Sequence, residues 1–361
     1  MNTGLTNPEV LSAFLNLPHT ILNRPHFVAP LQAGQRLLLE PNSPFWTQRK
    51  GRLFLVQDGT EWGRCAAFVE ESGACIGYFE ATSPTPGAQV LAQAEGWLHE
   101  QGATTLRGPM NGSTWYPYRF RLPGSPIKPF LLEPYNPDWY PQLWEEQGWQ
   151  TVKTYSTLQV SSQLWLPSPR QKQLQDYKDA GYSFRMAKMN QWERETACLH
   201  RLSLQIFQAN AFYTPLAYPE FQLLYQGAKA LIKPENLLYS LDPKGNEIGF
   251  LFTYPENSVK ISQLKGRKSL FSLLQYLGTP SNRETMVFKT IGVVPALRRV
   301  RPGAALLARA EEIFLNQGFS QGLHALMSDD NLSQSFAGSD DLPRARYALF
   351  QKVLRSTEHG L

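Results

Sequence analysis

The sequence predicts an α+β protein made of two halves, each a mixed, mostly antiparallel sheet flanked by helices. Several strand-like segments follow one another without an intervening helix, which argues against a doubly wound α/β sheet. In both halves these segments are followed by a strand, a helix, a strand, a short helix and a final strand. The length of 361 residues also fits about two domains.

The first half covers residues 1–165 and begins its sheet with three strands. These are predicted at 52–57, 64–69 and 74–81, joined by turns at Asp58-Gly59 and Ser72-Gly73. A helix is predicted over 88–100 because its apolar residues fall on one stripe, Val90, Leu91, Ala94, Trp97 and Leu98. The remaining elements are a strand at 103–107, a helix at 137–148 and a strand at 150–160.

The second half covers residues 166–361 and follows a polar stretch that contains two prolines. Its first elements are a strand at 183–188, helices at 191–208 and 218–232, and strands at 237–241 and 247–254. A polar insertion separates these from a strand at 286–294, a helix at 303–317, a strand at 322–327, a short helix at 330–337 and a strand at 345–353.

Composition narrows the class of protein. No run of about 18 apolar residues is present, and the first residues lack the pattern of a secretory signal, so we expect no membrane partner. The three cysteines, Cys65, Cys75 and Cys198, form no metal-binding or disulfide pattern, which fits a reducing, cytoplasmic location. No metal site is expected.

Charge is unevenly distributed between the halves. Residues 1–165 hold 11 Lys and Arg against 13 Asp and Glu, whereas residues 166–361 hold 24 against 17. A basic second half suits an anionic ligand such as a nucleotide cofactor or a nucleic acid, although such charges also serve simply to solvate a surface.

The most informative stretch is residues 292–314, GVVPALRRVRPGAALLARAEEIF. A strand-like run meets a basic turn and then an amphipathic helix, which is the usual way to build a phosphate-binding cradle. Such turns favour glycine, yet Arg301 and Pro302 lie near the centre of this one. Arginine tolerates a positive φ poorly, and proline supplies no N–H.

The element order and several motifs resemble the GNAT acyltransferase superfamily, and the whole chain resembles a tandem GNAT protein. In the first half the motifs are RGPMN at 107–111 and PYNPDWYPQLWEEQGW at 134–149. In the second half they are GNEIGFLFTYPEN at 245–257 and the strand–turn–helix at 292–314. The resemblance covers most of residues 45–355 and implies acetyl-CoA or another acyl-CoA as co-substrate.

The resemblance assigns the cofactor to the second half. In the family, backbone N–H groups of the turn after the fourth strand bind the pyrophosphate of acyl-CoA. The residues so implied are Arg298, Arg299, Arg301, Gly303, Ala304 and, at the start of the short helix, Asn331. Backbone groups of the strand at Ile291 and Val293 are implied to bind the pantetheine arm, although Val293 equally suits a core position. A strand–helix corner with solvated arginines is the alternative interpretation.

The first half departs from the family motif. Its corresponding connection, residues 82–89 (TSPTPGAQ), has no basic residue and contains two prolines, which remove N–H donors. We expect no cofactor there and a role in shaping the acceptor site or the domain interface. The GPMN run at 108–111 reads either as a ligand loop or as a structural turn.

Catalytic candidates follow from the needs of acyl transfer, which are a neutral amine, oxyanion donors and an acid for the leaving thiolate. The usual family tyrosine is missing from the short helix, so Tyr347 is the nearest candidate acid, or else a packed aromatic residue. Glu220 is the candidate base, or a residue favoured by a helix N-terminus. Asn210 and Tyr213 are candidate acceptor contacts, or plain loop residues.

Three functions remain open from the sequence. The first is an acyl-CoA-dependent N-acyltransferase, such as an N-acetyltransferase, acting on a small amine or amino-acid-like acceptor. The second is a non-catalytic GNAT-like protein that binds a ligand or partner. The third is an aminoacyl-tRNA-dependent transferase, for which the chain offers no dedicated RNA module. The sequence does not indicate the oligomeric state.

Overall fold

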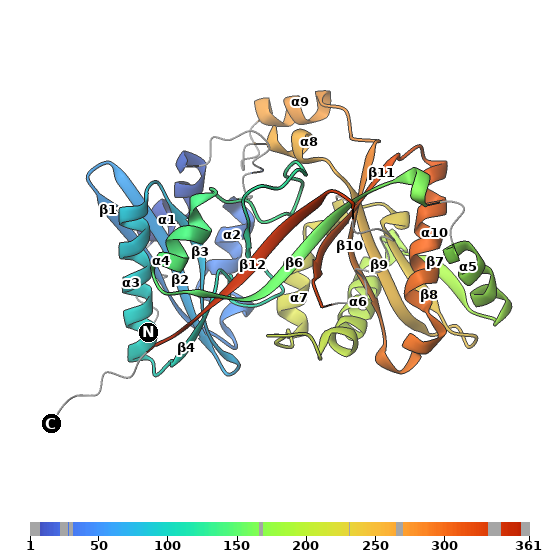
Figure 1. Ribbon diagram of the computed structural model, residues 1–361, viewed down its shortest axis with the longest axis horizontal. Helices are drawn as coiled ribbons and strands as arrows, with labels where there is room; N and C mark the ends of the chain where they lie inside the picture. The colour runs from blue at the N-terminus through green and yellow to red at the C-terminus, as the bar shows by residue number, and fades with distance from the viewer. Residues whose placement is uncertain are drawn as a thin grey trace. The chain divides into compact units, whose positions relative to one another are not determined.

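The computed structural model describes residues 8–21, 28, 32–165, 169–230, 232–264, 270–330 and 341–354. Its strands form mixed sheets with helices packed on them (Figure 1). The predicted α+β fold class is therefore confirmed. No helix in these ranges is both long and apolar enough to cross a membrane.

The described chain divides into two compact units that interleave in sequence. Unit 1 comprises residues 1–155, 258–280 and 346–361, and unit 2 comprises 156–257 and 281–345. They differ from the contiguous halves predicted from the sequence because each half gives its last strand to the sheet of the other. Strand β12 (Arg344–Val353) pairs with β4 and β5 of the first half, and β6 (Gln150–Ser161) lies next to β11 of the second. We call this the strand exchange.

Unit 1 contains a sheet in the order β1-β2-β3-β4-β12, with the short β5 also paired to β12. The two predicted hairpin turns are confirmed, because Asp58 pairs with Glu61 and Glu70 with Gly73. Its elements are α1 (Pro8–Ile21), α2 (Gln32–Leu39), η1 (Pro44–Trp46), β1 (Lys50–Asp58), β2 (Glu61–Glu70), β3 (Gly73–Ala81), α3 (Pro84–Glu100), β4 (Thr105–Gly108), β5 (Phe120–Arg121), α4 (Trp139–Glu146), α8 (Ser258–Ser262) and α9 (Leu270–Gly278).

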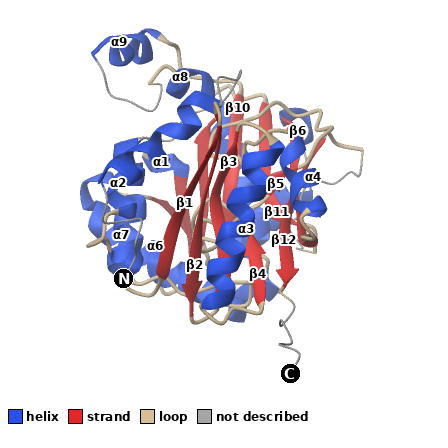
Figure 2. Ribbon diagram, turned by 90° about the vertical axis from the view of Figure 1, so that its left-hand side faces the viewer, coloured by secondary structure: helices blue, strands red, loops and turns tan. Residues whose placement is uncertain are grey.

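Helix α3 lies across the β1–β2–β3 face of this sheet (Figure 2). Val90, Leu91, Ala94 and Leu98 of the predicted apolar stripe are fully buried in the core of unit 1. The helix begins earlier than predicted, because Pro84 suits the first helical position, where the missing N–H costs nothing.

Unit 2 contains a sheet in the order β6-β11-β10-β9-β8-β7, in which β10 and β11 run parallel. Its elements are η2 (Ser162–Leu164), α5 (Pro169–Asp179), β7 (Ser183–Met186), η3 (Met189–Gln191), α6 (Trp192–Phe207), α7 (Tyr218–Tyr225), η4 (Ala228–Ala230), η5 (Pro234–Asn236), β8 (Leu237–Leu241), β9 (Glu247–Pro255), β10 (Thr285–Val293), η6 (Pro295–Val300), α10 (Pro302–Asn316) and β11 (Gln321–Ser328).

Helices α10 and α6 cover opposite faces of the unit 2 sheet. Leu251 of β9 packs in the core with Leu306 of α10, whereas the ring of its neighbour Phe250 lies 6.1 Å from that of Phe207 on α6. Successive residues of a strand point to opposite faces, so the two helices sandwich the sheet. Helix α5 packs beside α10 (Figure 1).

The insertion between β9 and β10 is not polar throughout, contrary to the sequence prediction. It contains α9, whose nine residues are LFSLLQYLG, with exposed leucines at 273, 274 and 277. Helices α1, α2 and α5 were not predicted from the sequence. The predicted short helix at 330–337 lies almost wholly outside the described residues.

Candidate functional site

The parallel strands β10 and β11 separate partway along their length. Their pairing runs from Thr285 with Gln321 to Phe288 with His324. Strand β10 then continues to Val293 and β11 to Ser328 without a further pair between them among the described residues. Beyond Phe288 and His324, the side of β10 that faces β11 is therefore not occupied by strand pairing.

Two irregularities accompany this separation. On β10 the register with β9 shifts between Phe288 and Thr290, so Lys289 lies in a β-bulge. On β11, Leu326 has a φ of 58°, and its N–H donates to Oγ1 of Thr157 on β6 at 3.1 Å. A bulge bends the strand that carries it, and β11 is bound to β6 on its other side. Both features separate β10 from β11.

The turn beyond β10 ends at the N-terminus of helix α10. Arg301 lies between η6 and α10 with φ 53° and ψ 43°, a left-handed conformation. The first helical hydrogen bond is that from Ala305 N–H to the Arg301 carbonyl. Pro302 has no N–H, so Gly303 and Ala304 present the N–H groups of the first turn. These groups and the helix dipole favour an anion.

The three arginines of the turn have different roles. Nη2 of Arg298 donates to the carbonyl of Ile206 at 3.2 Å, and its Nε to the carbonyl of Val293 at 3.4 Å. Arg298 thereby joins the end of α6 to the end of β10, and its predicted contact with phosphate stays a prediction. The side chains of Arg299 and Arg301 are exposed and make no hydrogen bond or ion pair within the described residues, which leaves them able to bind an anion.

The end of β10 packs closely against α6. A Cβ placed on Gly292 would lie 2.6 Å from Cγ2 of Ile206, so only glycine allows this approach. Val293 is buried in the core of unit 2, as the sequence allowed, and Ile291 packs partly buried against the same core. The role predicted for Ile291 and Val293 uses their backbone groups. Packing of their side chains in the core does not prevent that role.

Unit 1 repeats the same elements but closes the equivalent space. Strand β3 also carries a bulge, at Tyr78, and pairs in parallel with β4. There the N–H of Met110 donates to the Ile76 carbonyl at 2.8 Å, and Oδ1 of Asn111 accepts from the Tyr78 N–H at 2.6 Å. A Cβ on Gly77 would meet the Met110 carbonyl oxygen at 2.2 Å. In unit 1 the GPMN run therefore pairs with β3 at the position where, in unit 2, β10 and β11 have separated.

The helix N-terminus in unit 1 is also unsuited to a phosphate. Ser83 precedes α3, and its hydroxyl donates to the carboxylate of Glu61. Pro84 and Pro86 supply no N–H groups in the first turn. An acid at this end of α3, in place of the arginines that precede α10, opposes the binding of an anion.

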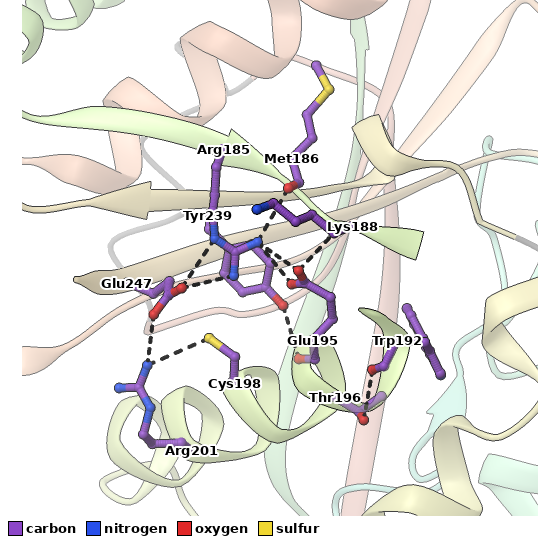
Figure 3. A network of polar contacts seen from close by, with 10 residues as sticks. All are labelled: Arg185, Met186, Lys188, Trp192, Glu195, Thr196, Cys198, Arg201, Tyr239 and Glu247. Carbon is purple, nitrogen blue, oxygen red and sulfur yellow. Dashed lines mark hydrogen bonds and ion pairs between the residues drawn. The ribbon is translucent and has the colours of Figure 1, made fainter. Parts of the chain in front are cut away.

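A partly buried ionic network fixes α6 against strands β7 and β9 (Figure 3). Arg185 of β7 donates to both carboxylate oxygens of Glu195 on α6 at 2.9 and 3.0 Å, and to Glu247 of β9 at 3.0 Å. The guanidinium lies 4.1 Å from the Tyr239 ring centroid, and Arg201 reaches Glu247 from the next turn of α6. The network positions α6, whose end contacts Gly292 and Arg298.

Tyr347 belongs to unit 1, whereas the turn at Arg301 belongs to unit 2. Its side chain is fully buried, and its hydroxyl donates to Glu133. Nε of Arg121 lies 3.3 Å from the same carboxylate. These contacts support the alternative interpretation of Tyr347 as a packed aromatic residue, and its role as an acid stays a prediction.

Three of the remaining site candidates, Glu220, Asn210 and Tyr213, lie in or next to α6 and α7. Glu220 is fully buried in the first turn of α7. Asn210 is exposed just after α6, and its carbonyl accepts from the N–H of Tyr213. Burial raises the pKa of Tyr213 to about 12, so its hydroxyl stays protonated at neutral pH. Asn331 lies outside the described residues. Within those residues, no three His, Cys, Asp or Glu side chains converge on a metal position.

No family model matches the chain. Protein YghO of Escherichia coli strain K12 is 23% identical over 283 residues, which cover 73% of this chain and 70% of YghO. A solved tandem GNAT protein from the clavulanic acid biosynthesis pathway superposes with a TM-score of 0.55, covering 97% of this chain and 96% of that one at 12% identity.

The chain has a GNAT-like fold. A GCN5-related N-acetyltransferase from Anabaena variabilis also superposes, with a TM-score of 0.52 at 8% identity, over 97% of this chain and 72% of that protein. The resemblance predicted from the sequence motifs is therefore confirmed at the level of the fold. The strand–turn–helix predicted from residues 292–314 corresponds to β10, the turn through Arg301 and α10.

Proposed function

We propose that the protein is an acyl-CoA-dependent N-acyltransferase whose acyl-CoA binds in unit 2. The observation that carries the proposal is the contrast between the repeated elements of the two units. In unit 2 the strands separate beyond Phe288 and His324 and lead to a helix N-terminus flanked by exposed arginines. In unit 1 Met110 and Asn111 close the same space.

Specific groups would hold each part of the cofactor. The N–H groups of Gly303 and Ala304 would bind the pyrophosphate, aided by the side chains of Arg299 and Arg301. Backbone groups of Ile291 and Val293 on β10 would bind the pantetheine arm. Acyl-CoA would supply the acyl group as a thioester, and a small amine would accept it. Cytoplasmic location and a small-molecule acceptor belong to the same proposal.

Amide hydrogen exchange on the full-length protein tests the location. Adding coenzyme A should slow exchange at 289–306 and leave residues 76–89 of unit 1 unchanged. Protection confined to unit 1 would contradict the proposed location. Failure to bind coenzyme A or acetyl-CoA, measured by calorimetry, would favour the non-catalytic alternative, for which Pro302 and the closed unit 1 are the structural arguments.

Paired variants sharpen the test. Arg299→Ala combined with Arg301→Ala should weaken coenzyme A binding by about tenfold to a hundredfold for each arginine that donates to the pyrophosphate, since one charge-assisted hydrogen bond contributes roughly 1.5–3 kcal/mol. Arg52→Ala, on β1 of unit 1, is the control and should bind as the parent does. Equal binding of coenzyme A by the parent, the double variant and Arg52→Ala would show that Arg299 and Arg301 do not bind the pyrophosphate.

A further inference from the structure

Strand β11 has a strained residue at Leu326, beyond its last pair with β10. A φ of 58° is unfavourable for leucine, because the Cβ then crowds the following carbonyl oxygen. Such a conformation persists only where neighbouring groups enforce it, and it is commonest at functional sites. A group that enforces it here is Thr157, which is fully buried and whose Oγ1 accepts the Leu326 N–H at 3.1 Å.

The position of Thr157 decides the direction in which this bond holds β11. The sheet order is β6-β11-β10, so the hydroxyl of Thr157 approaches β11 from the side opposite β10. The adjacent Ser156 binds the end of the same strand, since its hydroxyl donates to Oδ1 of Asp329 at 2.6 Å. Two neighbouring hydroxyl groups of β6 therefore hold β11 beyond His324, the last residue that pairs with β10.

Unit 1 uses the same kind of bond with the opposite result. Tyr78 on β3 has a φ of 51°, and its N–H donates to a side-chain oxygen, Oδ1 of Asn111, at 2.6 Å. Asn111 follows β4, the parallel neighbour of β3, so this bond joins the two parallel strands. In unit 2 the accepting side chain lies on the outer side of the parallel pair instead. The side from which the acceptor comes thus distinguishes the closed pair of strands from the separated pair.

We propose that Thr157 is a positioning residue for acyl-CoA, because it holds Leu326 in the conformation that keeps β11 from pairing further with β10. The inference rests on the proposed function of unit 2. Without the hydroxyl, an extended Leu326 would escape the steric cost, and its N–H would regain a partner by pairing with β10. The backbone groups of Ile291 and Val293 would then face β11 in place of a pantetheine arm. Since β6 comes from the first half of the chain, the strand exchange would give that half a part in forming the site.

Amide hydrogen exchange without ligand is the first test. Thr157→Val keeps the shape of the side chain and removes its hydroxyl. In the full-length variant, exchange at 289–293 should become slower as β11 pairs with β10, although a buried hydrogen bond is lost. A variant that was merely destabilised would exchange faster there, so unchanged or faster exchange overturns the inference. Coenzyme A is absent from this measurement, so the outcome does not depend on the proposed function.

Coenzyme A affinity, measured by calorimetry, is the second test. Thr157→Val should weaken binding by about twofold to tenfold, since the hydroxyl makes one neutral hydrogen bond. Thr157→Ser keeps the hydroxyl and should bind as the parent does. The matched control is Thr253→Val, because Thr253 is also buried in the unit 2 sheet and its hydroxyl donates to the Asn236 carbonyl at 3.4 Å.

The control should lose stability and keep its affinity for coenzyme A. Equal weakening by the two valine variants, or no recovery with serine at position 157, overturns the inference. If the parent itself binds no coenzyme A, the proposed function fails. Slower exchange at 289–293 in Thr157→Val would still support the role of Thr157 in separating the two strands.

Discussion

Arg298 donates a hydrogen bond to the carbonyl of Ile206, which lies 92 positions earlier in the chain. One side chain thereby joins the last turn of α6 to the turn that precedes α10. A cation at a helix C-terminus also interacts favourably with the helix dipole. The residue that the family motif predicts as a phosphate contact thus also links two elements that build the candidate site.

Arg298→Ala should therefore destabilise the protein by about 1–2 kcal/mol, because two carbonyl oxygens lose a charged donor. The melting temperature should fall by roughly 2–4 °C. Arg298→Lys should recover only part of the loss, since an ammonium cannot reproduce the planar fork. Arg299→Ala is the matched control and should change stability by less than about 0.5 kcal/mol. Equal effects at 298 and 299 would contradict the supporting role.

Gly292→Ala should cost about 1–3 kcal/mol, because the new Cβ would lie 2.6 Å from Cγ2 of Ile206. Combining it with Ile206→Ala should cost less than the sum of the single changes. Urea unfolding of the two single variants and the double variant measures this coupling. Gly96→Ala, at a helical position with open space around it, should be neutral or stabilising. Purely additive effects at 292 and 206 would show that the contact with Ile206 does not cause the loss of stability in Gly292→Ala.

Arg301→Gly should stabilise the protein without ligand by up to about 1 kcal/mol. A left-handed conformation costs a residue with a Cβ about 1–2 kcal/mol, from which the extra freedom of glycine in the unfolded chain subtracts about 0.5–1 kcal/mol. Arg301→Ala should leave stability nearly unchanged, because alanine bears the same cost. Thermal unfolding compares the three proteins, and a lower melting temperature for Arg301→Gly would contradict the prediction.

Glu311→Gln should gain stability relative to the parent as the pH rises. Burial raises the pKa of Glu311 to about 7, although Nη2 of Arg170 lies 3.0 Å away. The unfolded chain loses this proton near pH 4.5, whereas the folded parent keeps it up to about pH 7. The stability that the bound proton contributes is therefore complete below about pH 4.5 and is lost as the pH rises to about 7. The gap between variant and parent should widen by up to about 3 kcal/mol from pH 5 to pH 8. Glu312→Gln, at the neighbouring and partly exposed residue, should show no such trend, and a variant that loses stability at pH 8 would indicate a dominant ion pair.

The regular elements were predictable because apolar periodicity depends on the local sequence. The stripe on α3 and the hairpin turn after Asp58 were located from such patterns, and both are confirmed. The insertion was misjudged because its basic residues 265–268 obscured the apolar run that begins at Leu270.

The geometry of the candidate site depends on contacts that sequence patterns do not encode. Nothing near Lys289 indicates a bulge, and nothing near Arg298 indicates that its partner is Ile206. The sequence did place the turn between β10 and α10 and identified the conflict at Arg301, because the steric cost of positive φ belongs to a single residue.

The strand exchange has a consequence for synthesis on the ribosome. Leu106 and Gly108 of β4 pair with Lys352 and Phe350 of β12, which are synthesised about 240 residues later. At about 5–20 residues per second, the edge of β4 waits on the order of tens of seconds for its partner. An unpaired strand edge is prone to join other chains, so the nascent first half is exposed to aggregation until β12 is synthesised. Translation that stalls within the second half should therefore release an aggregation-prone fragment rather than a folded domain.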